Sequence, residues 1–313
     1  MIAAQIAELV LQQNHPEIYD IANQMVLAMN GLDSNLNDNF VTSSVWADDI
    51  KDKAMNFWES WHFYDRPVNP DGIYLQQDPI EAESNACTAL ERAVDEIMNS
   101  DGTKITAQKT IMIRYIIHIV GDVHQPLHSS NLFNETYNDS IGDMGGNLLN
   151  IITIDGVKEN LHAYWDQGAE VFQTPDFNPI PRPLSQQSKQ YLIQWSQKLM
   201  ESYSIESFGN LVNDLDIYNW TKESWEFAKN TTYPLMFETN QLDEQYHKNA
   251  QELCKSRVTL AGYRLANLLV DILQGYVVET SFNNQDKIQN SYLEEQVKEK
   301  YQSIFTYRKK LIE

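Results

Sequence analysis

Apolar residues recur at three- and four-residue intervals along most of the chain, the spacing that places side chains on one face of an α-helix. The first residues already follow this pattern, with Ile2, Ile6, Leu9 and Val10 on one face. The other segments with helical periodicity are 18–29, 45–58, 84–98, 106–120, 191–203, 220–230 and 245–273. We therefore predict a mainly α-helical protein.

Residues 148–154 depart from the helical pattern. They are rich in Leu and Ile and are followed by an Asp-Gly pair at Asp155 and Gly156, which predicts a strand or a small hairpin. Four prolines between residues 173 and 186 predict a connecting segment. The expected fold is a single mainly α domain with at most one small β-hairpin.

The composition fits one globular domain. With 313 residues, of which 42% are hydrophobic and 11% aromatic, the chain can bury one large core. The sequence contains no run of ~18 apolar residues that would predict a membrane span. It also contains no basic, apolar leader that would predict a signal peptide. Because the first helix has no N-cap residue ahead of it, we expect that a preceding segment is missing from this sequence.

Candidate chemistry is concentrated between His118 and His128. His118 and Asp122 are four residues apart in an apolar helical segment, so both side chains lie on one face. Pro126 predicts a bend that brings His128 to a neighbouring point. The spacing therefore predicts that two imidazoles and a carboxylate surround one place.

His162 and Asp166 form a second pair with the same spacing. A single buried histidine is more often a hydrogen-bonded core residue than a metal ligand. Burying several imidazoles and carboxylates together, however, costs on the order of several kcal/mol unless a cation pairs with them. Nitrogen and oxygen donors without cysteine favour zinc in a hydrolytic site. His124 and His247 have no motif partner.

With these residues identified, the chain resembles the S1/P1 nuclease family of secreted zinc-dependent nucleases, which share their fold with zinc-dependent bacterial phospholipase C. The motifs that carry the resemblance are Trp46-Ala-Asp48, Trp61-His-Phe-Tyr-Asp65, His118-x-x-Gly-Asp122, Gln125-Pro-Leu-His128, Gly145-Gly-Asn147, Asn160-Leu-His162, Trp165-Asp166 and Ala261-Gly-Tyr-Arg-Leu-Ala266. They occur in family order, and the block 118–166 is the most specific. The resemblance implies a nuclease-like domain at 1–274. The polar remainder, 275–313, is typical of a solvated helix or of an interaction arm.

The resemblance implies a cluster of three zinc ions. The residues that match the ligands of one zinc are Asp48, His62, His118 and Asp122. Those that match the ligands of a second are His128, His162 and Asp166. The family holds the third ion with an N-terminal Trp, a nearby His and the carboxylate that Asp122 matches. That Trp and that His are absent from this sequence, so we expect two zinc ions in the chain as written. We also expect activity at least ~100-fold below that of a chain with the segment restored.

The resemblance also implies how substrate is held. Lys51 matches a basic position near the phosphate, and the alternative is a solvated lysine on a helix face. Phe63 matches a residue that stacks on a base, with core packing as the alternative, and Asp65 matches one that hydrogen-bonds the base. Because stacking needs an unstacked base, the expected substrate is single-stranded RNA or DNA. The expected products carry 5′-phosphates, and 3′-nucleotidase activity is expected as well.

The formal net charge of −21 excludes the usual class of duplex binders, which present a basic face. It also argues against attraction to anionic membranes. A phosphodiester can still meet a positive site, because two or three zinc ions outweigh the three aspartates around them. We expect a monomer that acts on single strands without stable duplex binding.

Two further groups of residues bear on where the protein works. Cys87 and Cys254 permit one disulfide, and two buried free thiols are the alternative; the resemblance to a secreted family favours pairing. Candidate glycosylation sites are the sequons at Asn134, Asn138, Asn219 and Asn230. The resemblance implies a secreted or a lysosomal or vacuolar location.

Two alternatives to the nuclease remain at this point. The same metals could serve a phospholipase C-like phosphodiesterase, which an exposed apolar rim and a carboxylate pocket for choline would favour. The absent ligands of the third zinc would instead favour an inactive relative.

Overall fold

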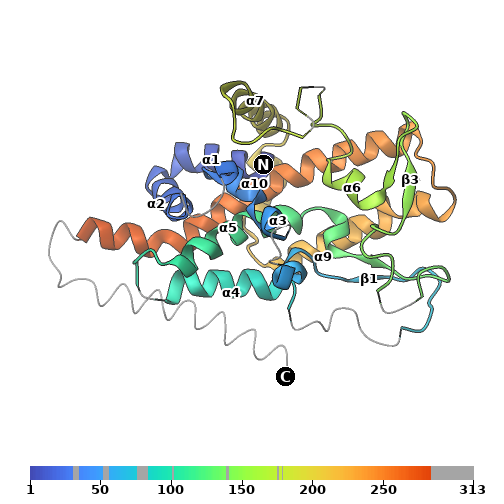
Figure 1. The fold of residues 1–313 in the computed structure, drawn as a ribbon, viewed down its shortest axis with the longest axis horizontal. Coiled ribbons are helices and arrows are strands. Elements are labelled where there is room, and N and C mark those ends of the chain that lie inside the picture. The colour runs from blue at the N-terminus through green and yellow to red at the C-terminus, as the bar shows by residue number, and fades with distance from the viewer. Residues whose placement is uncertain are drawn as a thin grey trace.

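One long helix organises the molecule. The structure, a computed structural model, describes residues 1–30, 35–51, 56–75, 84–100, 102–138, 141–174, 176–177 and 179–282. Helix α10, Glu244–Phe282, runs along the length of this described part (Figure 1). The helices that pack along it include α1 (Ile2–Asn14), α2 (Pro16–Leu27), α4 (Ala86–Asn99), α5 (Ala107–Asp122) and α7 (Gln186–Ser202). The mainly α fold class is confirmed.

Helix α1 lies directly on α10 because a glycine lets the two backbones approach. A Cβ atom on Gly262 would stand 2.6 Å from the Cβ of Ile6 and 2.9 Å from the carbonyl oxygen of Ala3. Such distances are shorter than van der Waals contact, so only glycine fits here. The apolar face read from Ile2 and Ile6 is buried against α10.

Polar residues define where several helices begin. Asn85 and Thr88 form a capping box at the start of α4. The Thr106 hydroxyl accepts a hydrogen bond from the Lys109 amide at the start of α5. Helix α6, Leu161–Asp166, begins in the same way at Asn160. The caps fix the starts of α5 and α6, which carry most of the candidate ligands.

The apolar side chains form two clusters. The larger one fills the space between α1, α2, α4, α5 and α10. The smaller one lies under α6 and includes Leu127, Ile151 and Trp165. None of the described helices combines the length and the apolar character needed to cross a membrane.

Two small sheets accompany the helices. The predicted hairpin is confirmed: β3, Asn150–Ile152, pairs antiparallel with β4, Lys158–Asn160. Gly156 takes a φ of 80° in its turn. An additional parallel pair, β1 (Pro67–Val68) with β2 (Asn131–Leu132), was not predicted. Its strands have two residues each, too few to show a periodicity in the sequence.

The predicted continuous helix over 45–58 is wrong. Helix α3 covers Trp46–Lys51, residues 52–55 lie outside the described part, and Asn56–His62 forms a 3₁₀ helix. The backbone of Trp58 is non-helical, with φ −108° and ψ 17°, so two short helical pieces meet at a kink there. Trp58 and Trp61 stack, with ring centroids 5.2 Å apart, and both pack edge-on against Tyr115. This aromatic packing accompanies the interruption of the helix.

In the C-terminal half the predicted helices differ from the structure at their ends, and the short helices Ile205–Phe208, Gly209–Asn213 and Pro234–Phe237 were not predicted. Helix α9, Ile217–Phe227, passes into a π-helical turn at Ala228–Thr232, where one helix over 220–230 was expected. Helix α10 continues beyond residue 273 to Phe282. Residues 283–313, most of the predicted polar extension, lie outside the described part.

The disulfide favoured above is absent. Cys87 and Cys254 are both buried free thiols. Cys87 belongs to the larger apolar cluster and Cys254 to the smaller one. Burial raises the pKa of each thiol to about 12, so both behave as inert core residues.

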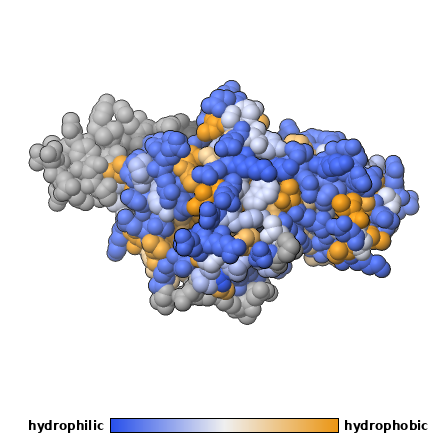
Figure 2. Space-filling view, turned by 90° about the horizontal axis from the view of Figure 1, so that it is seen from above, coloured by the Kyte–Doolittle hydropathy of each residue, from blue (hydrophilic) through white to orange (hydrophobic). Residues whose placement is uncertain are grey.

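The candidate glycosylation sites lie at the surface. Asn138, Asn219 and Asn230 are exposed and Asn134 is half-buried. Ser140, the last residue of the sequon at Asn138, lies outside the described part. The face seen in Figure 2 is mainly hydrophilic, with hydrophobic residues in small separate patches. Glycan attachment remains a prediction.

Candidate metal centre

Four predicted ligands converge in a first donor set. Oδ1 of Asp48 lies 3.6 Å from Nδ1 of His62 and 3.8 Å from Nε2 of His118. Oδ2 of Asp122 lies 3.1 Å from that His62 nitrogen and 2.7 Å from that His118 nitrogen. The four side chains come from α3, the 3₁₀ helix Asn56–His62 and α5. Residues 74 positions apart in sequence thus share one site.

Three predicted ligands form a second donor set beside the first. Nε2 of His128 lies 3.2 Å from Oδ1 of Asp166, and Nε2 of His162 lies 3.3 Å from Oδ2 of the same carboxylate. His128 belongs to the 3₁₀ helix Pro126–Ser129, which starts at the proline predicted to bend the chain. His162 and Asp166 lie on α6. The i, i+4 spacing does bring this pair to one face.

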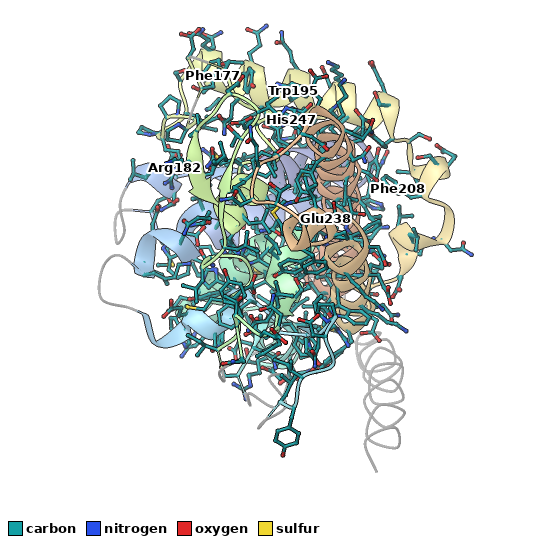
Figure 3. All side chains as sticks on the ribbon, turned by 90° about the vertical axis from the view of Figure 1, so that its right-hand side faces the viewer. Phe177, Arg182, Trp195, Phe208, Glu238 and His247 are labelled. Atoms are coloured by element: carbon teal, nitrogen blue, oxygen red, sulfur yellow. The ribbon has the colours of Figure 1, made fainter. Side chains whose placement is uncertain are left out.

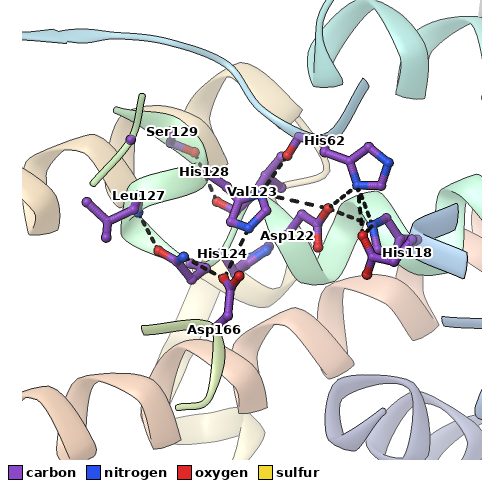
Figure 4. Close-up of polar contacts among 12 residues, drawn as sticks. His62, His118, Asp122, Val123, His124, Leu127, His128, Ser129 and Asp166 are labelled. Carbon is purple, nitrogen blue, oxygen red and sulfur yellow. Dashed lines mark hydrogen bonds and ion pairs between the residues drawn. The ribbon is translucent and has the colours of Figure 1, made fainter. Parts of the chain in front are cut away.

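Asp122 stands between the two donor sets. Its Oδ2 atom contacts the first set and lies 3.8 Å from Nδ1 of His128 in the second set (Figure 4). The Asp122 side chain is 17% exposed, whereas those of Asp48 and Asp166 are 48% and 45% exposed. The site therefore has a deep shared carboxylate and two outer carboxylates that face solvent.

Backbone carbonyls orient three of the four imidazoles. The Nδ1–H groups of His118, His128 and His162 point at the carbonyl oxygens of Ser44, His62 and Gly145, at 2.6, 2.7 and 2.7 Å. These hydrogen bonds leave the Nε2 lone pairs free to coordinate. His62 has the opposite ring orientation. Its Nδ1 atom faces the first set, and its buried Nε2 atom has no hydrogen-bond partner in the described part of the chain.

The spacing of the donors fits zinc. Two ligands of one tetrahedral zinc, each ~2.0–2.2 Å from the ion, lie about 3.3–3.6 Å apart. The donor pairs above lie 2.7–3.8 Å apart within the first set and 3.2–3.3 Å apart within the second. Small side-chain shifts would give ideal geometry. The donor types, imidazole nitrogen and carboxylate oxygen, are those of zinc sites as well.

The electrostatics of the first set point to a site for a cation. Burial would raise the pKa of Asp122, but His118 and His128 hold it well below its usual value. Burial would lower the pKa of His118, but Asp122 and Asp48 raise it to about 9. Asp122 thus stays ionised and keeps positive charge on His118, whereas burial lowers the pKa of His62. A divalent ion can replace those protons.

A glycine loop holds the second set from behind. Gly145 and Gly146 have positive φ angles of 60° and 85°. A Cβ atom on Gly145 would lie 2.7 Å from the carbonyl oxygen of Leu127, and one on Gly146 would lie 3.2 Å from the amide nitrogen of His162. Only glycine lets this loop lie against both segments and present its carbonyl to His162. The Gly-Gly-Asn motif therefore has a structural reason, while the Asn147 side chain bonds locally to the carbonyl of Met144.

The predicted substrate residues lie around the two sets. Nζ of Lys51 pairs with Oδ1 of Asp48 at 2.8 Å. Phe63 is half-buried and belongs to neither apolar cluster of the described residues. Asp65 is also half-buried; burial, aided by Asp143, raises its pKa to about 7 while His128 and His162 oppose the rise.

Sequence reasoning missed Gln125 as an individual contact. Its amide nitrogen donates to Oδ1 of Asp166 at 2.7 Å, and its amide oxygen accepts from the backbone of Leu127. Gln125 thus links the 3₁₀ helix of His128 to the carboxylate of the second set. Its position just before a helix-starting proline was the available signal, because that is an N-cap position.

Helix α6 is fixed to α10 behind the second set. The indole nitrogen of Trp165 donates to the Tyr246 hydroxyl at 3.1 Å. The hydroxyl of Tyr164 lies 2.8 Å from Nδ1 of His247, which is labelled in Figure 3. His247, without a motif partner in the sequence, thus supports the helix that carries His162 and Asp166.

A second support lies behind the first set. Arg264 is fully buried, pairs with Glu223 through two hydrogen bonds, and lies 3.0 Å from Nε2 of His124. His124 donates from Nδ1 to the carbonyl of Val120 at 2.7 Å. Burial and the nearby Arg257 and Arg264 lower the pKa of His124 well below its usual value. His124 is therefore a neutral acceptor that fixes the end of α5.

Helix α3 is held by a third contact. Arg182 makes a two-pronged ion pair with Asp49, at 2.6 and 2.9 Å, and also donates to Asn37 (Figure 3). Asp49 directly follows the ligand position Asp48 in α3. Each of the three α-helices that carry candidate ligands, α3, α5 and α6, is thus tied to a distant part of the chain.

Comparison with known proteins identifies relatives. A family model described as S1/P1 nuclease matches residues 1–274. Nuclease P1 of Penicillium citrinum is 24% identical over 242 residues, which cover 72% of this chain and 82% of that protein. Nuclease S1 of Aspergillus oryzae is 30% identical over 129 residues, or 39% of each chain. Endonuclease 3 of Arabidopsis thaliana is 23% identical over 233 residues, covering 72% and 73%.

Proposed function

Because the chain belongs to the S1/P1 nuclease family, we propose that it is a zinc-dependent phosphodiesterase that hydrolyses single-stranded RNA or DNA to 5′-phosphorylated products. We also propose 3′-nucleotidase activity, the removal of the 3′-phosphate from a nucleotide. The observation that carries it is the Asp122 carboxylate, which lies between two sets of zinc-type donors.

We assign two metal positions to the described residues. The first zinc would be held by Asp48, His62, His118 and Asp122, and the second by His128, His162 and Asp166. Their donor types and spacing support this assignment. Zinc bound there would polarise the phosphate, activate the attacking water and neutralise charge on the leaving oxygen.

The chain's own side chains would bind and orient the substrate. The Asp48 carboxylate raises the pKa of Lys51 against the effect of burial, so the ammonium stays charged and can attract a phosphate. The ring of Phe63, which is outside both apolar clusters, can stack on a base. With its pKa near neutrality, Asp65 can donate as well as accept a hydrogen bond at the edge of that base.

Single strands are the substrate that the charge distribution supports. With 44 acidic and 23 basic residues, the chain lacks the excess of cations that holds a duplex backbone. The seven proposed ligands belong to one chain, which supports action as a monomer.

The decisive experiment combines metal analysis with a cleavage assay. Purified protein should contain about two zinc ions per chain and should release 5′-phosphorylated products from single-stranded RNA. A chelator should stop the reaction, and added zinc should restore it. Protein that binds zinc but cleaves no nucleic acid would contradict the nuclease, and protein without zinc would contradict the metal assignment.

One observation favours a second candidate, hydrolysis of phospholipid head groups. Ile141, Met144 and Leu148 are 49%, 50% and 45% exposed beside the glycine loop that holds the second set. Such an apolar rim could rest on a lipid surface. Release of phosphocholine from phosphatidylcholine vesicles, with no cleavage of RNA, would support this candidate over the nuclease.

The proposed location is a secretory or vacuolar compartment. Three exposed sequon asparagines support it. Protein from the native source should lose mass on treatment with an N-glycosidase. An unchanged mass would contradict glycosylation at these asparagines.

A further inference from the structure

A surface pocket that none of the predicted metal or substrate residues lines lies at the edge of the small sheets. It has a volume of about 480 Å³ and lies between the turn after β1, the turn after β2, the start of β3 and the 3₁₀ helix Pro234–Phe237. We propose that this pocket binds a base of the same single strand that is cleaved at the metal centre. The inference rests on the proposed function and extends it to a second contact with the substrate.

The lining of the pocket suits a nucleobase. Two aromatic side chains, Tyr137 and Phe237, line it, and aromatic rings can stack on any base. Three amide side chains accompany them and can donate and accept hydrogen bonds at a base edge; they are Asn134, Asn150 and Asn240. The volume lies in the range of small-molecule sites.

The charge of the lining favours a base over a phosphate. The only ionisable carboxylate or cation among the lining residues is Asp71, a carboxylate. It would repel a phosphate group but accept a hydrogen bond from an exocyclic amino group. Adenine, cytosine and guanine carry such a group, so we expect the pocket to prefer them to uracil or thymine.

The backbone connects the pocket to the metal centre. Two chain segments run side by side from the proposed ligands His62 and His128 towards the pocket. Backbone hydrogen bonds of 2.8–2.9 Å join them: the amides of Tyr64, Asn131 and Phe133 donate to the carbonyl oxygens of His128, Arg66 and Val68, respectively. Asn134 lies six residues beyond His128, at most about 20 Å along an extended chain. At a rise of at least ~3.4 Å per nucleotide, that distance corresponds to about six nucleotides or fewer.

The walls of the pocket are fixed in place. The side-chain oxygen of Asn134 accepts hydrogen bonds from the amides of Thr136 and Tyr137, each at 2.9 Å. On the opposite side the amide of Ile152 donates to the carbonyl of Asn240 at 2.8 Å, which ties β3 to the segment after Phe237. A preformed pocket binds a base without first having to order its own loops.

Chain-length dependence of cleavage tests the proposal. Wild-type kcat/KM should rise between dinucleotide and hexanucleotide substrates. Phe237→Ala should reduce the increase in kcat/KM with substrate length at least ~5-fold, which is the lower limit for the loss of one stacked base. The change should appear in KM and not in kcat. Phe237 is 46% exposed, so its truncation leaves the fold intact. Phe237→Trp should retain the rise, and Ile205→Ala, at a 41% exposed position on α8 (Ile205–Phe208), should not alter it.

A cross-linking experiment separates failure of the pocket from failure of the nuclease. A hexanucleotide with a 5-iodocytosine at one end is irradiated with protein from a host that attaches no N-glycans, because a glycan on Asn134 would fill the pocket. A cross-link at Tyr137 or Phe237 supports the pocket, whether or not the strand is cleaved. Cleavage that is independent of length, with no such cross-link, overturns the pocket alone. Neither cleavage nor a cross-link overturns both.

Discussion

At the scale of single residues, the centre depends on side chains whose charge is set by their neighbours. Asp122 contacts both donor sets, and His118 and His128 keep its pKa well below the usual value. The outer carboxylates of Asp48 and Asp166 are about half exposed. Loss of charge at the buried, shared position should therefore be the most damaging single change.

Asp122→Asn should reduce cleavage of single-stranded RNA at least ~100-fold, because it removes a ligand of the first proposed ion and a negative charge beside the second. Zinc content should fall as well, while the far-ultraviolet circular dichroism stays that of a folded helical protein. Asp20→Asn, at an exposed position on α2, is the matched control and should change neither quantity. Full activity in the Asp122 variant would contradict the assignment of Asp122 as a zinc ligand.

The two thiols give a second test at this scale. Cys87 and Cys254 are buried, and their pKa values are raised to about 12, so neither is ionised near neutral pH. A thiol reagent should modify no cysteine in the native protein and two after denaturation without reductant. If denatured protein yields no free thiol, the cysteines are paired and the structure is wrong on this point.

At the scale of elements, each α-helix that carries proposed ligands is held by a polar contact with a distant segment. The end of α5 is held by His124, which lies 3.0 Å from the Arg264 guanidinium on α10. The same guanidinium makes two hydrogen bonds with Glu223 on α9. Water cannot reach the Arg264 guanidinium, whose side chain is 0% exposed, whereas the Glu223 side chain is 24% exposed.

Arg264→Met should destabilise the protein by roughly 3 kcal/mol, the lower end of the usual cost of breaking a buried ion pair, because Glu223 keeps its ion pair with Arg257. Urea denaturation at a fixed zinc concentration measures the change. The matched control is Lys248→Met on the same helix, which removes a pair whose partners are 68% and 83% exposed; its cost should stay below ~1 kcal/mol. Equal losses in the two variants would show that the buried network does not stabilise the fold.

The sequence predicted elements well where one segment contains its own signal. The spacing of His162 and Asp166, the Asp-Gly turn of the hairpin and the helical periodicity are all local, and the structure has each of them. The supports were not predictable, because His124 meets Arg264 across 140 positions and Tyr164 meets His247 across 83. Spacing rules describe neighbours on one helix and contain no information about such contacts.

Similar reasoning explains the errors at element ends. The helix expected over 45–58 carried the right periodicity, but the chain kinks at Trp58, which stacks on Trp61 and packs edge-on against Tyr115. The β1–β2 pair arises from two residues in each of two distant segments. The disulfide was predicted from the resemblance to a secreted family and not from any contact between the two cysteines. Cys87 and Cys254 lie in separate apolar clusters.

At the scale of the whole molecule, a strongly acidic chain surrounds a site for anionic substrate. Repulsion from a net charge of −21 opposes the approach of a polyanion. Attraction would then come from the bound ions, from Lys51 and from base stacking. Only the electrostatic part of this attraction depends strongly on salt.

We therefore expect a weak response of KM to salt. A protein that neutralises six to ten phosphates loses about 10³–10⁵-fold in affinity between 50 and 200 mM salt. With one lysine near the phosphate, the same relation for single strands gives a change of only about 3-fold, and screening of the −21 charge reduces it further. The measurement is KM for a single-stranded hexanucleotide over this salt range, at constant zinc. A rise of ~100-fold or more would show that the strand follows a basic track on the protein, and the acidic surface would then have to be interrupted along the path from the metal centre.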